Sequence, residues 1–299
     1  MPRFLGLLSA ASLAFCATAH AAAPLRGCPA IEKFGDGTIS RPGVYAGHIT
    51  FSEDRRVAVW SAQDPANGFL LTLYISYWRG AAWSEPEVLP FSGTYLDTDP
   101  TFAPDGGTLY FNSMRPTHPG EEKADFDLWM VRYSRRGWEK PVHLEGDVNS
   151  PSMELSSSFD RAGTLYFASN RDNDQWDIYR AERRWDGDFR PAEKVGGGVN
   201  TPDYWEYNPQ ISPDGRTLVF TSLSRPDSHG YGDLYASHAR RGDFEPARNL
   251  GPCVNSGADD YSPTVLWDAG RLVYVRNFIE DPDWTPAFFT LDLQYLLRD

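Results

Sequence analysis

The chain is predicted to fold as an all-β protein, a β-propeller with five four-stranded blades. A β-hairpin pattern recurs five times along its 299 residues, complete copies carry two further strands, and the strand that the last copy lacks occurs near the N-terminus. The repeat period is near fifty residues, which is typical of propellers and solenoids. Six blades stay open as the alternative, because the first and last copies lack the Pro-Asp-Gly turn.

The clearest copy of the hairpin is NPQISPDGRTLVFTS, residues 208–222. Two short β-prone runs flank Pro213-Asp214-Gly215-Arg216, where the aspartate can hydrogen-bond nearby backbone and the glycine tolerates a positive φ. When the copies are aligned, the second strands place aromatic residues at separations of 51, 56, 53 and 54: Trp60, Phe111, Phe167, Phe220 and Tyr274.

The outer strands suggest how the ring closes. In the complete copies a third strand follows the hairpin, beginning at Asp127, Asp177 or Asp233, and a proline-containing fourth strand comes after it. Proline fits an edge strand, where its missing N–H needs no partner. Residues 29–35 resemble a fourth strand, and the last copy has none. We therefore expect this N-terminal segment to complete the last blade, because an open ring leaves unpaired edges.

The first residues read as an export signal. Arg3 precedes an apolar run that ends in Ala19-His20-Ala21, an A-x-A cleavage pattern. We predict a signal peptide over residues 1–21 and one propeller domain over residues 22–299, about 56 residues per blade. The apolar run is too short to span a bilayer. The expected location is the periplasm or the extracellular space.

The charge of the chain excludes some partners. There are 28 basic and 41 acidic residues, a net charge of −13, and no run rich in Lys or Arg. Duplex nucleic acid and anionic membrane surfaces are therefore not expected partners. A protein partner, or a small cationic or sugar ligand in the cell envelope, is compatible with this charge.

Several repeat motifs resemble one family. ISPDGRTLVFTS, SFDRAGTLYFASNR followed by DIYRA, and VNS or VNT before a new blade are similar to the TolB-type propeller repeat, over essentially the whole mature chain. Members of that family are typically six-bladed or part of larger exported proteins. The resemblance implies an interaction module of the cell envelope.

Known catalytic and cofactor motifs are missing from the sequence. It contains no H-E-x-x-H, no Cys/His cluster with zinc spacing, no G-x-S-x-G elbow and no Walker or dinucleotide glycine pattern. The sequence therefore implies no catalytic residues, no cofactor and no metal.

One recurrent acidic position is the candidate binding site. Nine residues before the turn position, four copies carry an acid, and the first copy has Ala46 instead; the acids are Asp97, Glu154, Glu206 and Asp260. Since innermost strands surround the propeller axis, these carboxylates are expected to form a partial ring at one mouth of the central channel. The alternative is that each acid accepts backbone N–H bonds within its own blade as part of the framework.

A second recurrent pattern suggests structural ion pairs within blades. Arginine follows the second strand and aspartate opens the third, which predicts pairs of Arg115 with Asp127 and of Arg171 with Asp177. Tyr204-Trp205, beside a blade junction, either lines a binding face or is buried.

The two cysteines of the mature chain are Cys28 and Cys253. Export would permit a disulfide. However, if the first starts one outer strand and the second ends the neighbouring one, about 20 Å separates them, too far for a disulfide. The sequence leaves their pairing open.

These observations favour an exported TolB-like propeller that acts as a non-catalytic binding scaffold. The alternative function is a glycoside hydrolase like the five-bladed arabinanases, in which inner-strand carboxylates would serve as acid and base or nucleophile.

Overall fold

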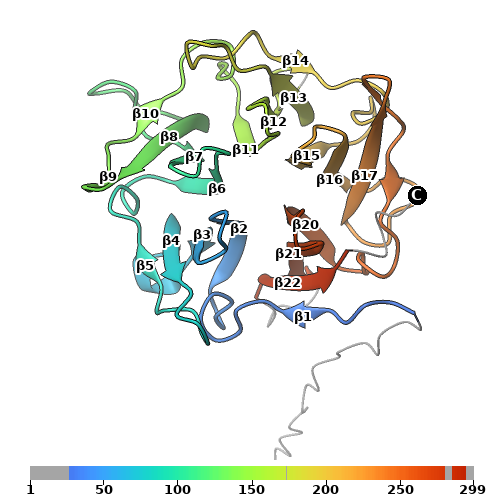
Figure 1. Cartoon of the computed structure of the whole chain (residues 1–299), viewed down its shortest axis with the longest axis horizontal. Coiled ribbons are helices and arrows are strands. Elements are labelled where there is room, and N and C mark those ends of the chain that lie inside the picture. Colours follow the sequence, from blue (N-terminus) through green and yellow to red (C-terminus); the bar gives the residue numbers. More distant parts are fainter. Residues whose placement is uncertain (1–26, 173, 280–284, 294–299) are drawn as a thin grey trace, which may run out of the picture.

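The computed structural model describes residues 27–172, 174–279 and 285–293. Five β-sheets are arranged as blades around a central axis (Figure 1). The predicted fold class is therefore confirmed, with five blades and not six. The predicted signal peptide lies outside the described residues, and within them no helix is long and apolar enough to cross a membrane.

Each blade runs antiparallel from an inner strand to a short outer strand. Blade 1 contains β2 (Tyr45–Phe51), β3 (Val57–Gln63), β4 (Leu71–Tyr77) and β5 (Glu87–Val88). Blade 2 contains β6 (Asp97–Phe102), β7 (Thr108–Ser113), β8 (Asp127–Ser134) and β10 (Val142–His143), with β9 (Gly137–Trp138) also paired to β8. A short 3-10 helix, η1 (Pro65–Asn67), lies between β3 and β4.

The next two blades repeat this plan. Blade 3 contains β11 (Glu154–Phe159), β12 (Leu165–Ser169), β13 (Asp177–Ala181) and β14 (Glu193–Lys194). Blade 4 contains β15 (Glu206–Ile211), β16 (Thr217–Leu223), β17 (Gly232–Arg240) and β19 (Arg248–Asn249), with β18 (Asp243–Phe244) also paired to β17.

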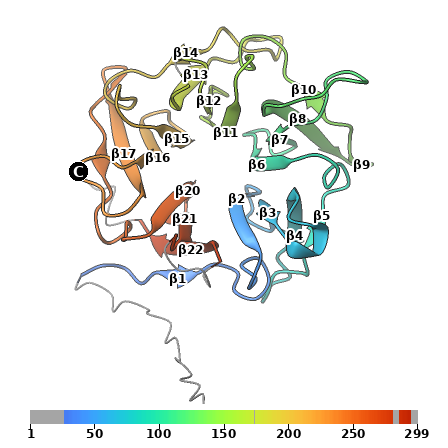
Figure 2. The same cartoon turned by 180° about the vertical axis from the view of Figure 1, so that it is seen from behind.

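Blade 5 joins the two ends of the chain. It contains β20 (Asp259–Leu266), β21 (Arg271–Asn277), β22 (Ala287–Asp292) and, as its outer strand, the N-terminal β1 (Glu32–Lys33). Glu32 lies opposite Thr290 and Lys33 opposite Phe289. Figures 1 and 2 show β1 along the outer edge of β22. The predicted closure of the ring by the N-terminal strand is confirmed.

The hairpin turns use the predicted chemistry. In blade 4, Gly215 adopts a φ of 71°, and the Ser212 hydroxyl accepts the Thr217 N–H at 2.8 Å. Blade 1 makes the corresponding turn with Arg55 at a φ of 56°. The turn geometry is therefore kept even where glycine is absent, at the energetic cost of a non-glycine residue in the left-handed region.

The core lies between blades. The five aligned aromatic residues are all fully buried, and each packs against the preceding blade around the ring: Trp60, Phe111, Phe167, Phe220 and Tyr274. Trp60 of blade 1, for example, shares a cluster with Val273 and Phe288 of blade 5. Because every blade buries its apolar face on a neighbour, the closed ring has no exposed core face.

A disulfide joins Cys28 to Cys253, with their Cα atoms 5.2 Å apart. The strand arithmetic that separated them is therefore wrong, for two reasons. The outer strand β1 lies along β22 of blade 5, and the segment before it runs on toward the side of blade 4 (Figure 1). In addition, the chain turns at Gly251 after β19 and crosses to blade 5, where the Tyr274 hydroxyl donates to the Val254 carbonyl. Cys253 thus belongs to the connector between the blades.

Candidate functional site

The antiparallel order of strands divides the loops between two faces of the ring. Inner and third strands begin, and second and outer strands end, at one face, which we call the top face. The hairpin turns lie at the opposite face, which we call the bottom face.

The four recurrent acids begin inner strands at the top face, and all four are fully buried: Asp97, Glu154, Glu206 and Asp260. Asp97 Oδ1 accepts hydrogen bonds from Arg115 Nη2 at 2.7 Å and Ser113 Oγ at 2.6 Å, and Oδ2 accepts one from Ser92 Oγ at 2.7 Å. The carboxylate is thus held by its own blade and by the connector that leads into it.

The other three acids repeat this arrangement. Their ion pairs are Glu154–Arg171 at 3.1 Å, Glu206–Arg225 at 2.7 Å and Asp260–Arg276 at 2.6 Å. A connector residue also donates both its backbone N–H and its hydroxyl to each acid: Ser150, Thr201 and Ser256, respectively. Burial raises the pKa of these three carboxyls, and the hydrogen bonds and arginines oppose that rise. This geometry favours the framework alternative; a direct binding role for the four acids stays a prediction.

Blade 1 lacks the inner-strand acid and contains a different ion pair instead. Ala46 stands at the acid position, and the ion pair is reversed: Arg41 on the connector bonds to Asp64, after the second strand, at 2.8 Å. The charges have changed places, while the connector remains tied to the end of the hairpin.

The predicted pairs of Arg115 with Asp127 and of Arg171 with Asp177 are wrong. Each arginine turns inward over the aromatic rings of its own blade, with Arg115 4.8 Å from the ring centroid of Phe111, and reaches the inner strand. The two aspartates have other cations: Asp127 bonds to Lys123 and His143, and Asp177 to Lys194. The sequence spacing predicted that each arginine pairs within its own blade, but it did not predict that the side chain turns toward the inner strand.

A polar belt links the inner strands further down. Each inner strand carries a β-bulge, and the residues there form hydrogen bonds across blades: His48, Asp99, Ser156, Asn208 and Ser262. Ser156 Oγ donates to Asp99 Oδ2 at 2.6 Å and accepts from Asn208 Nδ2; His48 Nδ1 lies 3.1 Å from Ser262 Oγ. Burial lowers the pKa of His48, which keeps the imidazole neutral in this belt. The belt is a second set of framework contacts.

The two faces differ in charge. Among described residues, the top loops carry eleven carboxylates and five cations, whereas the bottom loops carry thirteen and twelve. The top loops are residues 34–44, 64–70, 89–96, 114–126, 144–153, 170–172, 174–176, 195–205, 224–231, 250–258, 278–279 and 285–286. The bottom loops are residues 52–56, 78–86, 103–107, 135–141, 160–164, 182–192, 212–216, 241–247 and 267–270. Three of the five top cations are arginines already bonded to inner-strand acids: Arg115, Arg171 and Arg225. The negative charge of the chain is therefore concentrated on the top face.

Exposed aromatic residues also lie on the top face. Five of them begin strands or occupy top loops: Tyr45, Phe69, Tyr95, Trp205 and Tyr231. Trp205 is 43% exposed and is therefore not buried; its role in a binding face stays a prediction. Tyr45 and Phe69 pack edge to face, with ring centroids 6.0 Å apart. Aromatic groups with an exposed polar tip are enriched in protein interfaces.

Asp259 differs from the other acids at the starts of inner and third strands among the described residues, which all make an ion pair or, in the case of Asp233, accept three hydrogen bonds. It makes no ion pair, and its Oδ1 lies against the backbone of Gly232 in no position for a hydrogen bond of normal geometry. Burial, followed by repulsion from Asp260, raises the pKa of Asp259 to about 6. The half-buried Tyr207 and Tyr261 lie within electrostatic range of this carboxylate.

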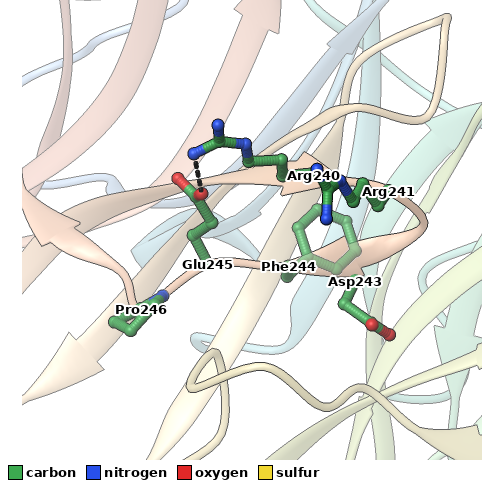
Figure 3. Close-up of a pocket in the computed structure, with 6 residues that line it drawn as sticks. All are labelled: Arg240, Arg241, Asp243, Phe244, Glu245 and Pro246. Carbon is green, nitrogen blue, oxygen red and sulfur yellow. Dashed lines mark hydrogen bonds and ion pairs between the residues drawn. The ribbon is translucent and has the colours of Figure 1, made fainter.

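A hollow of about 460 Å³ lies away from these residues, beside the β17–β18 hairpin at the bottom face (Figure 3). Its lining is Arg240, Arg241, Asp243, Phe244, Glu245 and Pro246. Figure 3 shows Arg240 turned toward Glu245 across the hairpin, at 3.5 Å. Phe244 is part of the core, and the charged groups point to solvent, so we assign no site here. In the described residues, no group of three or more His, Cys, Asp or Glu side chains is placed to hold a metal ion.

Sequence reasoning missed Asp259, although the repeat contains its signal. The residue before the repeat acid is apolar or aromatic in four blades and aspartate in blade 5: Tyr45, Leu96, Met153, Trp205 and Asp259. The acids that recur in the repeat belong to the framework. The signal for Asp259 is that blade 5 departs from the repeat at this position.

Comparison with known proteins supports the fold alone. No protein-family model matches the chain, and no curated protein matches it. A protein described as TolB from Agrobacterium tumefaciens is 16% identical with a TM-score of 0.54, over 85% of this chain and 78% of that one.

Two glycoside hydrolase structures are similar to the same degree. An α-L-arabinofuranosidase from Lactobacillus brevis is 14% identical with a TM-score of 0.52, over 86% of this chain and 93% of that one. An endo-arabinanase from Bacillus licheniformis is 10% identical with a TM-score of 0.52, over 82% and 93%. At these identities the comparisons show only that the chain shares the β-propeller fold with these three proteins.

Proposed function

We propose that this protein is an exported, non-catalytic binding module whose top face docks a partner in the cell envelope. One observation carries the proposal: the top loops carry a net negative charge, and five of the eight exposed aromatic residues among the described residues lie on the top face, while the bottom loops are nearly neutral. A charged surface with aromatic anchors suits recognition, because the charge steers association and the rings supply contact area.

Export is supported by two features. The sequence predicts a signal peptide over residues 1–21, which lies outside the described residues. The disulfide between Cys28 and Cys253 is the kind of bond that persists in oxidising compartments. Together they support a periplasmic or secreted location.

The hydrolase alternative requires a pair of carboxylates about 5 to 10 Å apart that are free to act as acid and base or nucleophile. The four inner-strand acids instead hold arginines and serine or threonine hydroxyls, and Asp99 accepts from Ser156 and Thr98. Asp259 remains as a single carboxylate without such a partner. This arrangement favours binding over hydrolysis.

Site-specific photo-cross-linking tests the proposal. A benzoyl-phenylalanine is placed at Trp205 on the top face or, as the matched control, at Trp185 on the bottom face, which is 95% exposed. In native envelope extract we expect a discrete cross-linked product from position 205 and none from position 185. Equal products from both positions, or hydrolysis of a glycan in a parallel screen, would overturn the proposal.

A further inference from the structure

The corner between blades 4 and 5 of the top face contains an acid that the fold leaves without a partner. Asp259 opens β20, where the corresponding residues of blades 2 and 3 are Leu96 and Met153. Its neighbour Asp260 is fully buried and bonded to Arg276, whereas the Asp259 side chain is half-buried and has no ion pair. The inference below rests on the proposed function and specifies what the top face recognises.

Three tyrosines lie near this carboxylate. Tyr207 is the second residue of β15, Tyr261 is the third residue of β20, and Tyr231 directly precedes β17 with 54% of its surface exposed. Asp259 acts electrostatically on the hydroxyls of Tyr207 and Tyr261. The backbone on both sides of Tyr231 lies against the start of β20, because a Cβ at Gly230 would lie 1.8 Å from the Ala258 carbonyl oxygen. We call Asp259, Tyr207, Tyr231 and Tyr261 the tyrosine corner. Gly232 makes room for it, because a Cβ there would lie 2.2 Å from Asp259 Oδ1.

The neighbouring charges add to the negative potential. Asp260 and Asp233 both act on Asp259. Asp233 is already committed: it accepts the N–H groups of His229 and Gly230 and a bond from Asn249. With these neighbours engaged, Asp259 is the carboxylate of the corner that makes no ion pair, and its buried Oδ1 accepts no hydrogen bond. A hard metal ion requires several oxygen ligands, whereas an ammonium or guanidinium requires one carboxylate and benefits from ring faces.

We propose that the tyrosine corner receives a lysine or arginine side chain of a polypeptide that docks across the top face. A polypeptide is favoured over a free amine because the acidic loops and exposed rings extend well beyond the corner, from Tyr45 and Phe69 in blade 1 to Trp205 in blade 4. A basic segment complements this charge, and the corner supplies its most specific contact, a charge-assisted hydrogen bond flanked by aromatic rings.

The test uses the full mature chain and a defined probe, a fluorescent peptide of five arginines alternating with serines. In its matched control peptide, citrulline replaces arginine, which removes the charge and keeps the shape. We expect the arginine peptide to bind, the citrulline peptide to bind at least tenfold more weakly, and added salt to weaken the arginine peptide. Free butylguanidinium, the small-molecule arm, is expected to compete only at far higher concentration.

Two corner variants and two matched bottom-face variants locate the contact. We expect Asp259→Asn to weaken the peptide about tenfold or more, and Tyr231→Ala about three- to tenfold. Asp268→Asn and Tyr133→Ala, whose residues are exposed at the bottom face, are expected to change affinity less than twofold. Unchanged affinity in both corner variants, or equal binding of both peptides, would overturn the inference.

Cross-linking at position 205 separates the two proposals. If the Trp205 product forms and persists in Asp259→Asn, the top face docks a partner but the corner is not its cation site, and the inference alone fails. If the Trp205 product does not form even in the protein that keeps Asp259, both the proposed function and this inference fail.

Discussion

The acids of the inner strands fall into two groups, and the contrast between Asp97 and Asp259 shows what each group does. Asp97 is fully buried and accepts three hydrogen bonds, one of them from Arg115. Asp259 begins an inner strand of the same face, yet it has no ion pair and its pKa is raised to about 6. The first position recurs, and its blade and connector satisfy it, while the second breaks the repeat and has no ion pair within the described residues.

This contrast teaches that a repeat protein separates its framework from its specificity. Positions that recur are determined by what every blade needs, here a tie between connector and hairpin. A position that departs from the repeat at a cost in stability is a better candidate for function. Each prediction below perturbs one side of this comparison.

The largest effect on the free energy of unfolding is expected from removing the disulfide between Cys28 and Cys253. Cys253→Ser removes a cross-link between residues 225 apart in sequence, which should lower the free energy of unfolding by about 3–5 kcal/mol. Urea unfolding under non-reducing conditions measures this. Cys28→Ser should cause the same loss, and the double variant no further loss. A midpoint unchanged by either substitution would show that β1 pairing alone closes the ring.

The next effect comes from a framework acid. Asp97→Asn leaves the guanidinium of Arg115 buried without its anion, and removing one partner of such a pair costs about 3–5 kcal/mol in other proteins; we expect about 3 kcal/mol here. Denaturant unfolding at low and high salt provides the measurement. A loss below about 1 kcal/mol would mean that the Asp97–Arg115 pair stabilises the protein no more than an exposed surface ion pair does. The contrast between Asp97 and Asp259 would then be weaker.

The sequence predicted the fold well, because turn chemistry, periodicity and the missing outer strand are local or repeated signals. Residues 29–35 were placed on blade 5 correctly, and the aromatic series from Trp60 to Tyr274 does lie in the core. What failed depends on side-chain direction and strand twist. Arg115 and Arg171 turn inward rather than toward the third strand, and the segment before β1 brings Cys28 to Cys253.

The candidate site was only partly predictable. Trp205 was singled out from the sequence, and it is exposed on the top face. Asp259 was not, because its importance lies in the contacts that it lacks. Only the structure shows that Asp260 pairs with Arg276, whereas the adjacent Asp259 has a buried oxygen without a hydrogen-bond partner.

Asp259→Asn should stabilise the protein at neutral pH. The folded pKa, about 6, lies above the usual 3.8, so stability is lost as the pH rises from about 3.8 to about 6, and the full loss is present above pH 6. Removing the charge should raise the free energy of unfolding at pH 7 by roughly 1–3 kcal/mol. Below about pH 4 the group is protonated in both states, and the gain should vanish. Urea midpoints from pH 4 to 7 check this, and a loss of stability at pH 7 would contradict it.

The smallest effect on stability is expected from the exposed rings. Tyr231→Ala and Tyr133→Ala should each change the free energy of unfolding by less than about 0.5 kcal/mol, because both side chains are more than half exposed. Their effects on docking should differ, since only Tyr231 is in the tyrosine corner. Thermal unfolding, combined with peptide binding to the same samples, makes the comparison. Equal effects on binding would remove the distinction between the two faces.

The central claim is that Asp259 is an ionisable group kept without a partner in order to meet a cation. Titration of its carboxyl carbon by NMR tests this most directly, with the signal assigned from its absence in Asp259→Asn. We predict a pKa of about 6 in the free protein, which should fall toward or below the usual 3.8 when the arginine peptide is bound and not when the citrulline peptide is added. A free pKa near 4, or one that the arginine peptide leaves unchanged, would contradict the account.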